Sequence, residues 1–279
     1  MKTENLNTLQ TKITDNEAKS SVDCRVIQPK RFISFSGGVE SSTLCLIYGK
    51  VAKPIFADTG SEHEEMYERL DYFEKRMKEF HGNDFEIIRV SKGSLKDYIK
   101  KSNFFPSPNA RYCTRMFKIE PIDDFLMSQG KCELMIGLNV DEASDRTGNY
   151  GLQTNVKYTY PLVENGLTRD HCKIMLKKAS LEPAFPPYMK RGGCDLCFYK
   201  SKAEWRALVL LNEQKAKQLA DFEESVQDKR EKYFFINSGI GKMRDFIQAV
   251  KDQGELFDLS QTYPTYDDNH SPCGVFCHR

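Results

Sequence analysis

Residues 36–43 (SGGVESST) have the types and spacing of a phosphate site, and they follow an apolar run. Two adjacent glycines allow a tight turn and a close approach of the backbone to a ligand. A helix that begins after them would direct unpaired N–H groups and the positive end of its dipole at an anion. An ordinary strand–turn–helix corner is the alternative, since the lysine of the Walker motif is absent. The nucleotide interpretation is favoured, and its predicted residues are Ser36, Gly37, Gly38, Glu40, Ser41 and Ser42.

Polar residues at two further expected strand ends extend this candidate site. The turn formed by Asp58, Thr59 and Gly60 follows an apolar run, and its carboxylate could accept hydrogen bonds from a ribose or adenine, or bind Mg²⁺. Gly137 and Arg146 flank a second acidic turn. A solvated polar turn is the alternative in each case. Because open α/β sheets bind ligands at the carboxyl ends of their strands, we predict that both turns contact the nucleotide.

Cysteines at metal-ligand spacing form a second candidate site. Cys194 and Cys197 follow two glycines in a C-x-x-C arrangement, which lets both sulfurs reach one metal. A redox dithiol of this spacing belongs to a thioredoxin-like unit, and the sequence lacks that pattern. Cys113 stands at an expected helix start among cations, which should depress its pKa and favour the thiolate. Its neighbours Arg115 and Lys118 could neutralise phosphate or sulfate, with a solvated basic loop as the alternative.

Two cysteines near the end of the sequence, Cys273 and Cys277, leave several roles open. Cys273 could complete a cluster with Cys113, Cys194 and Cys197, because soft thiolates select an iron–sulfur cluster or zinc. A closed zinc site of Cys194, Cys197, Cys273 and Cys277 is the structural alternative. The other cysteines are expected to be core or incidental thiols, and they are Cys24, Cys45, Cys132 and Cys172.

Alternating apolar patterns predict the elements that position these residues. Strands are expected at 31–36, 54–57, 85–90 and 134–140, and helices at 39–48, 61–82, 95–100 and 119–128. The second helix is expected to begin with a capping box of Ser61 and Glu64. Its predicted buried stripe is Met66, Leu70, Phe73, Met77 and Phe80. The alternation predicts an α/β fold, with a parallel sheet covered by helices on both faces.

The character of the sequence changes after Pro161. Helices are expected at 168–178, 203–227 and 243–250, and several prolines between 183 and 187 mark a break. We therefore predict a flexible N-terminal tail over 1–28 and a nucleotide-binding α/β domain over 29–182. A smaller helical lobe that contains the cysteine motif is expected over 183–279.

Composition narrows the function classes. A net charge of +1 excludes a global basic surface for nucleic acid, although a local basic patch is compatible with it. No apolar run is long enough to span a membrane, and residues 1–21 lack the apolar core of a signal peptide, so we expect a cytoplasmic protein. Nine cysteines in that reducing compartment favour free thiols, metal ligands or redox groups over disulfides. Nothing in the sequence indicates an oligomeric state.

From Ser36 to Cys197 the order of motifs resembles the PAPS reductase family. This family of the PP-loop (adenine nucleotide alpha-hydrolase-like) superfamily includes sulfonucleotide reductases and the DNA phosphorothioation sulfurtransferase. The S-G-G-x-x-S segment resembles the PP-loop, the D-T-G at 58–60 resembles the family's second motif, and Cys113 resembles one cysteine of its C-C-x-x-R-K motif. Cys273 loosely resembles the tail cysteine that attacks sulfur in the reductases, although Pro272 replaces the family's glutamate.

The resemblance implies a PP-loop fold, an adenine nucleotide (ATP, PAPS or APS) and sulfur chemistry at a 4Fe-4S cluster. The favoured reaction is reduction of an adenylyl sulfate to sulfite, in which a thiolate of Cys273 or Cys277 attacks sulfur and a thiol reductant releases sulfite. The alternative is adenylation with loss of pyrophosphate, followed by sulfur transfer from a donor protein to nucleic acid or another acceptor. A non-catalytic nucleotide- and zinc-binding module is the third hypothesis.

Overall fold

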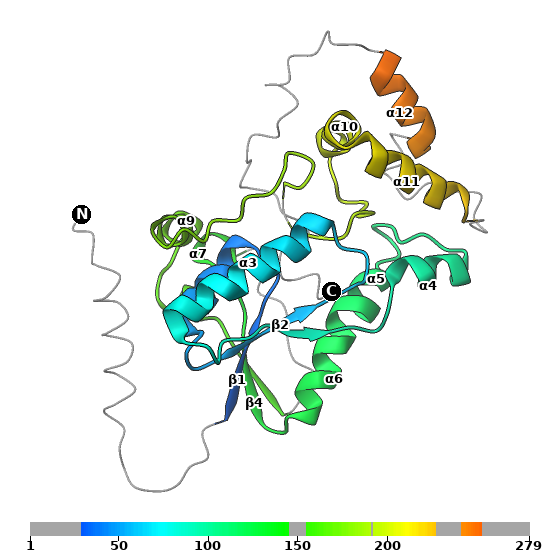
Figure 1. The fold of residues 1–279 in the computed structure, drawn as a ribbon. Helices are drawn as coiled ribbons and strands as arrows, with labels where there is room; N and C mark the ends of the chain where they lie inside the picture. The colour runs from blue at the N-terminus through cyan, green and yellow to red at the C-terminus, as the bar shows by residue number, and fades with distance from the viewer. Residues whose placement is uncertain (1–28, 145–154, 191, 227–240, 253–279) are drawn as a thin grey trace, which may run out of the picture.

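The computed structural model describes residues 29–144, 155–190, 192–226 and 241–252, and a five-stranded parallel sheet lies at its centre (Figure 1). The strands are β1 (Lys30–Ser34), β2 (Lys53–Ala57), β3 (Ile88–Val90), β4 (Cys132–Met135) and β5 (Val156–Thr159). They are ordered β3-β2-β1-β4-β5, and every adjacent pair is parallel. The carboxyl ends of all strands therefore lie at one edge of the sheet. The predicted parallel α/β fold is confirmed.

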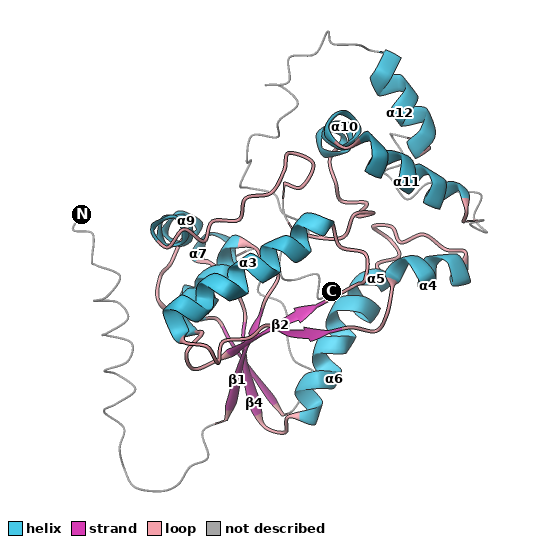
Figure 2. Ribbon diagram, in the orientation of Figure 1, coloured by secondary structure: helices cyan, strands magenta, loops and turns pink. Residues whose placement is uncertain are grey.

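Helices cover both faces of this sheet, as the sequence predicts (Figure 2). One face carries α2 (Val39–Tyr48), α3 (Glu64–His81) and α9 (Arg169–Lys178), and the other carries α6 (Glu120–Ser128). Successive side chains of a strand point to opposite faces, so alternate residues supply two cores. Ile33 and Met135 are buried with α2 and α3, whereas Phe32 and Leu134 are buried with α6.

Short helices fill the connections, and a group of three helices follows the sheet. The connections contain α4 (Leu95–Ser102), α5 (Tyr112–Thr114), a π-helical turn (Arg115–Ile119), α7 (Val140–Ala143) and α8 (Pro161–Glu164). The later helices are α10 (Lys202–Leu211), α11 (Glu213–Glu224) and α12 (Met243–Asp252), which pack against one another (Figure 1). Their buried residues, Trp205 among them, belong to the same apolar cluster as Ile33 and Phe73. The domain boundary after residue 182 stays a prediction.

The expected single helix over 203–227 is instead two helices, α10 and α11. Asn212 stands between them with φ −145° and ψ 67°, and its side chain accepts a hydrogen bond from the Lys215 N–H at 3.0 Å. Asparagine is among the preferred N-cap residues because its short side chain satisfies an orphan N–H group. The apolar pattern continues across Asn212, so the sequence did not indicate that a second helix begins there.

The expected capping box at Ser61 is also wrong. The N-cap residue of α3 is His63, and its side chain makes no capping hydrogen bond. The Ser61 hydroxyl instead accepts a hydrogen bond from the Lys96 N–H of α4 at 3.2 Å. Of the predicted apolar stripe of α3, only Phe80 is exposed, because it lies at the last turn of the helix.

Three strands, β1, β3 and β4, are shorter than expected, and one strand was not predicted. Ile55 of β2 pairs with Ile88, so the ladder of β3 begins there rather than at residue 85. β4 ends at Met135, after which Gly137 crosses closely over the first turn of α2. β5 is the additional strand, and it pairs with β4 at the edge of the sheet.

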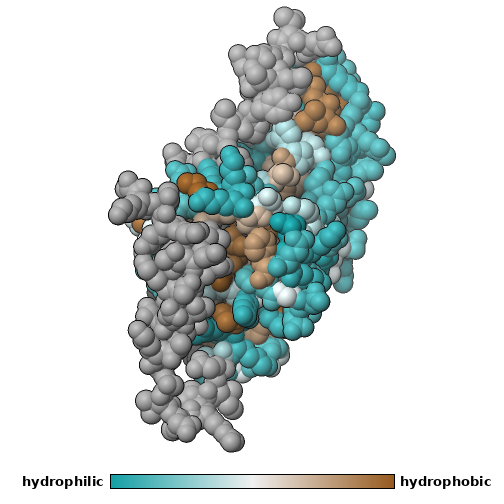
Figure 3. Space-filling model, turned by 60° about the vertical axis from the view of Figure 1, so that its left-hand side comes forward, coloured by the Kyte–Doolittle hydropathy of each residue, from teal (hydrophilic) through white to brown (hydrophobic). Residues whose placement is uncertain are grey.

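One face of the described part of the molecule is mainly hydrophilic. On the face drawn in Figure 3, hydrophobic side chains of the described residues gather in small separate groups within a mainly hydrophilic surface. Among the helices that the structure describes, none combines the length and the apolar character needed to cross a membrane.

Candidate functional site

The phosphate loop leaves β1 and enters α2 through Gly37 and Gly38. Gly37 has φ +74°, a conformation that side chains disfavour, and a Cβ there would lie 2.4 Å from the Met66 methyl carbon. Gly38 is the N-cap of α2, and having no side chain it leaves the N–H groups of the first helical turn uncapped. Uncapped N–H groups at the positive end of a helix dipole are suited to an anion. The predicted tight turn and helix start are both present.

Hydroxyl groups inside this loop bind one another. The Ser36 N–H donates to Ser41 Oγ at 3.2 Å, and the two hydroxyls lie 3.2 Å apart. Thr43 donates to the Val39 carbonyl at 2.9 Å, and Ser42 Oγ is buried without a hydrogen-bond partner. Ser36 and Ser41 therefore hold the loop in shape. Their direct contact with phosphate stays a prediction.

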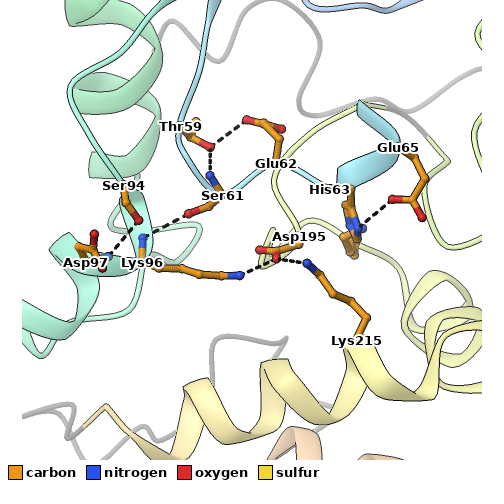
Figure 4. Close-up of polar contacts among 11 residues, drawn as sticks. Thr59, Ser61, Glu62, His63, Glu65, Ser94, Lys96, Asp97, Asp195 and Lys215 are labelled. Carbon is orange, nitrogen blue, oxygen red and sulfur yellow. Dashed lines mark hydrogen bonds and ion pairs between the residues drawn. The ribbon is translucent and has the colours of Figure 1, made fainter. Parts of the chain in front are cut away.

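The turn after β2 is built by its own polar residues. Asp58 Oδ1 accepts hydrogen bonds from the Gly60 N–H and from the Tyr67 hydroxyl, each at 2.8 Å. Thr59 donates to Glu62 Oε1 at 2.9 Å, as Figure 4 shows. Burial and the hydrogen bond to Asp58 raise the pKa of Tyr67. One carboxylate oxygen of Asp58 is thus used to hold the turn itself, as the polar-turn alternative predicts. A role of Asp58 in binding a ligand stays a prediction.

The C-x-x-C turn lies directly against both preceding loops. A Cβ on Gly192 would be 3.3 Å from the Ser36 carbonyl oxygen, so this glycine allows the cysteine turn to approach the phosphate loop. Cys194 forms an antiparallel bridge with Glu62, and the Asp195 N–H donates to the Ser61 carbonyl at 2.9 Å. The structure therefore brings the two candidate sites together.

Three predicted cysteines share one cavity. Cys113, Cys194 and Cys197 line a space of about 20 Å³ together with Thr59 and Lys118. Burial raises the pKa of the Cys113 thiol, and the nearby Lys118 only partly opposes it. The expected depression of this pKa is therefore wrong, because burial outweighs the cations. A hydrogen bond with Cys197, together with burial, also raises the pKa of Cys194.

Buried charged residues surround this cavity, and two of them, Glu62 and His63, were not predicted as site residues. Burial lowers the pKa of Lys118, but Glu62 and the three cysteines outweigh it, so its pKa is raised overall and the amine stays charged. Glu62 is buried, and burial raises its pKa. Lys200 lies 2.7 Å from His63 Nε2, and burial lowers the pKa of both residues, that of His63 to about 2.

Asp195, inside the C-x-x-C motif, joins the cysteine turn to two helices. Its side chain is 1% exposed, and Oδ2 accepts from Lys96 of α4 at 2.6 Å and from Lys215 of α11 at 3.1 Å (Figure 4). Oδ1 is buried without a hydrogen-bond partner. One carboxylate thus connects the cysteine turn with α4 and α11.

Several predicted residues lie apart from this arrangement or outside the described residues. The Arg115 side chain is 70% exposed and lies 3.7 Å from Glu120 of the same helical segment, so it faces solvent rather than the cavity. Gly137 packs on the backbone of Glu40 and Ser41. Three predicted site residues fall outside the described ranges, and they are Arg146, Cys273 and Cys277.

A metal site is not assembled within the described ranges. No three His, Cys, Asp or Glu side chains there are arranged to hold a metal ion, although three thiols line one cavity. The missed residues Glu62, His63 and Asp195 each stand beside a recognised motif. A charged residue inside an otherwise buried turn was the signal that could have found them.

The parallel sheet, the glycine turn after β1 and the uncapped start of α2 define an α/β domain of the PP-loop type. Residues 30–162 match the Phosphoadenosine phosphosulfate reductase domain family. The matched segment is somewhat less than half of the 279 residues.

Other comparisons are more distant. An uncharacterized protein of Methanocaldococcus jannaschii, MJ0973, is 24% identical over 180 residues, which are 62% of this chain and only 42% of that relative. A phosphoadenylyl-sulfate reductase of Candida auris, solved with phosphate, has a TM-score of 0.43 at 12% identity and covers 64% of this chain and 90% of its own. The U34-tRNA thiolase NcsA of Methanococcus maripaludis, solved with its [4Fe-4S] cluster, has a TM-score of 0.44 at 14% identity. The match covers 90% of this chain and 82% of the thiolase.

Proposed function

We propose that this protein binds an adenine nucleotide at the phosphate loop and carries out thiol-dependent sulfur chemistry beside it. The favoured reaction is reduction of an adenylyl sulfate (PAPS or APS) to sulfite. The observation that carries the proposal is the close approach of Gly192 to the phosphate loop, since a Cβ added there would lie 3.3 Å from the Ser36 carbonyl oxygen. The family match of residues 30–162 supports the choice of substrate class.

The proposed reaction has two steps. A thiolate of Cys273 or Cys277 attacks the sulfate sulfur, the bond from sulfur to the bridging oxygen breaks, and the adenosine phosphate leaves with both electrons of that bond. A dithiol reductant, such as a thioredoxin-type protein, then attacks the cysteine sulfur and displaces sulfite. Its second thiol resolves the mixed disulfide, so the two electrons that reduce the sulfate come from the reductant. The uncapped N–H groups of α2 would hold the phosphate of the leaving group.

The cysteine cavity has the chemistry of a thiolate-bound metal site. Cys113, Cys194 and Cys197 are soft donors, and the charged amine of Lys118 would offset part of the negative charge of their thiolates. Cys273 is the proposed fourth ligand of a 4Fe-4S cluster, in which case Cys277 is the nucleophile, and a zinc ion is the alternative. When bound, such a cluster would supply electrostatic and redox properties near the sulfur that reacts.

One observation favours the alternative reaction, adenylation followed by sulfur transfer. The buried carboxylate of Glu62 lies beside Lys118 and raises its pKa, so the charge of this lysine is already partly balanced. The anionic sulfo group of an adenylyl sulfate would gain less from such a pair than from an unbalanced lysine. In this alternative ATP activates an oxygen of the acceptor, pyrophosphate leaves, and a sulfur donor replaces the adenylate. Nucleic acid is one candidate acceptor, and Mg²⁺ would accompany ATP.

Nucleotide binding is tested first, by calorimetry with ATP, PAPS and APS. Gly38 has φ −78°, which other residues adopt, and an added Cβ would meet only Ser36 Oγ at 3.4 Å. We expect Gly38→Val to abolish binding while the fold is kept, because its branched side chain occupies the approach to the helix start. Gly38→Ala is the smaller matched change. Wild-type protein that binds no adenine nucleotide would refute the proposed function.

Turnover then separates the reactions. Sulfite release from PAPS or APS with reduced thioredoxin supports reduction, and pyrophosphate release from ATP, Mg²⁺ and nucleic acid supports adenylation. The Cys273→Ala/Cys277→Ala variant should lose sulfite release, whereas Cys132→Ala, a buried thiol of β4, should keep it. Sulfite release that survives the double change would exclude the tail cysteines as nucleophile. Nucleotide binding without either product would favour the non-catalytic module.

Metal content is measured on protein purified without oxygen. A cluster should give brown protein with stoichiometric iron and labile sulfide, and Cys113→Ala should lose both. Cys45→Ala, at a buried thiol of α2, is the matched control. Colourless protein with zinc that Cys113→Ala does not remove would replace the cluster with a closed zinc site.

A further inference from the structure

Glu40 places a carboxylate in the first turn of α2, where the proposed nucleotide phosphates would bind. It is the second residue of the helix, and it is buried with 8% of its surface exposed. The residue stands next to Ser41, whose hydroxyl holds the phosphate loop in shape. An uncompensated carboxylate at this position would repel a polyphosphate and would itself occupy the favourable field of the helix dipole.

Two side chains from other elements bind this carboxylate. Asn139, which is fully buried at the N-cap of α7, donates its Nδ2 to Glu40 Oε1 at 3.0 Å. Arg169, the first residue of α9, donates its Nη1 to the same oxygen at 2.5 Å. The Arg169 side chain is 19% exposed, so water screens this ion pair only weakly.

The backbone holds these partners in place. The Arg169 N–H donates to Asp141 Oδ2 at 2.9 Å, which ties the start of α9 to α7. Gly137 approaches the Glu40 backbone so closely that a Cβ would lie 3.1 Å from its carbonyl carbon. The loop after β4 and the start of α9 are therefore both docked on the first turn of α2.

We propose that Arg169 is a positioning residue that neutralises Glu40, so that the phosphate loop accepts a polyanionic ligand. Asn139 orients the carboxylate, and Arg169 supplies the compensating charge. Loss of Arg169 would expose the ligand to the charge of Glu40, and the repulsion would grow with the number of ligand phosphates. This inference rests on the proposed nucleotide site.

The test is a double-mutant cycle of Arg169→Met and Glu40→Gln, with ATP, ADP, AMP and inorganic pyrophosphate as calorimetric probes. Arg169→Met should weaken ATP binding by about tenfold or more and AMP binding by about threefold or less, which is the pattern of charge repulsion. In the Glu40→Gln background the same change should alter ATP affinity by less than about threefold. Arg169→Lys keeps the charge and should bind ATP almost as wild type does. Arg244→Met, at an exposed arginine of α12, is the matched control and should change nothing.

Three results would overturn the inference. Equal weakening of ATP and AMP, or a loss that Glu40→Gln does not rescue, would mean that Arg169 acts by another route. An unchanged ATP affinity in Arg169→Met would remove its role. Circular dichroism confirms that each variant is folded, and Arg169→Gln, which also removes the charge, replaces Arg169→Met if the latter does not fold. Wild-type protein that binds pyrophosphate but no adenine nucleotide would refute the proposed function and leave this inference open to test. The double-mutant cycle would then be measured with pyrophosphate as the ligand. Protein that binds neither would refute both.

Discussion

Asp195→Asn tests whether the buried carboxylate of the C-x-x-C turn holds the surrounding elements together. The change keeps the shape of the side chain but removes the anion shared by Lys96 and Lys215. Removal of one partner of a buried ion pair costs roughly 3–5 kcal/mol, because a charge is left without compensation. Here the two lysine side chains are 29% and 17% exposed, so water can partly hydrate them. We therefore expect a loss of about 2–3 kcal/mol in the free energy of unfolding.

The measurement is urea unfolding followed by fluorescence. Trp205 is the single tryptophan of the sequence and is fully buried in α10, so its emission reports on the helices that Asp195 connects. Asp221→Asn is the matched control, since its exposed side chain pairs with Arg244 and should contribute less than about 1 kcal/mol. A free energy for Asp195→Asn within about 0.5 kcal/mol of wild type would refute the reasoning.

Three further predictions concern stability. His63 is buried and its pKa is lowered to about 2, so between pH 6.5 and pH 2 the imidazole takes up a proton only in the unfolded state. The free energy of unfolding should therefore fall as the pH drops, by about 2 kcal/mol at pH 5. His63→Gln should remove this part of the pH dependence, measured by urea unfolding at several pH values. Gly37→Ala should destabilise by about 1–2 kcal/mol through its positive φ and the clash with Met66, and strict additivity with Met66→Ala would contradict the clash. Phe73→Ala, at a fully buried ring, should cost about 3–5 kcal/mol, whereas Phe80→Ala at the exposed end of α3 should cost less than about 1; equal costs would contradict the assignment of the core face.

Sequence signals predicted those elements whose ends are marked by residues immediately next to them. The helix over 39–48 has the predicted bounds, since Gly38 and Gly49 mark its two ends. The helix that starts after Thr168 is also confirmed, and the Thr168 side chain accepts a hydrogen bond from the His171 N–H. The edge strand β5 was missed because its short V-K-Y-T pattern gains order from pairing with β4, a partner distant in the sequence.

The site was harder to predict because its contacts join distant segments. The motif cysteines were recognised from spacing, but the pairing of Asp195 with Lys215 depends on where α11 packs. The raised pKa of Cys113 has the same origin, since burial depends on the surrounding fold rather than on the neighbouring cations. Local spacing indicates which residues can do chemistry, and tertiary packing decides their charge state.

The bridge between Glu62 and Cys194 has a consequence for the order of folding. Its two residues lie about 130 positions apart in the sequence, so forming it closes a very long loop. The closure entropy of such a loop is about 4 kcal/mol plus a constant, and it is repaid only once the sheet and α3 are already in place. The cysteine turn should therefore gain protection from hydrogen exchange after β1, β2 and β4 during refolding. A metal that requires this turn would be inserted into a chain whose nucleotide-binding half has already formed.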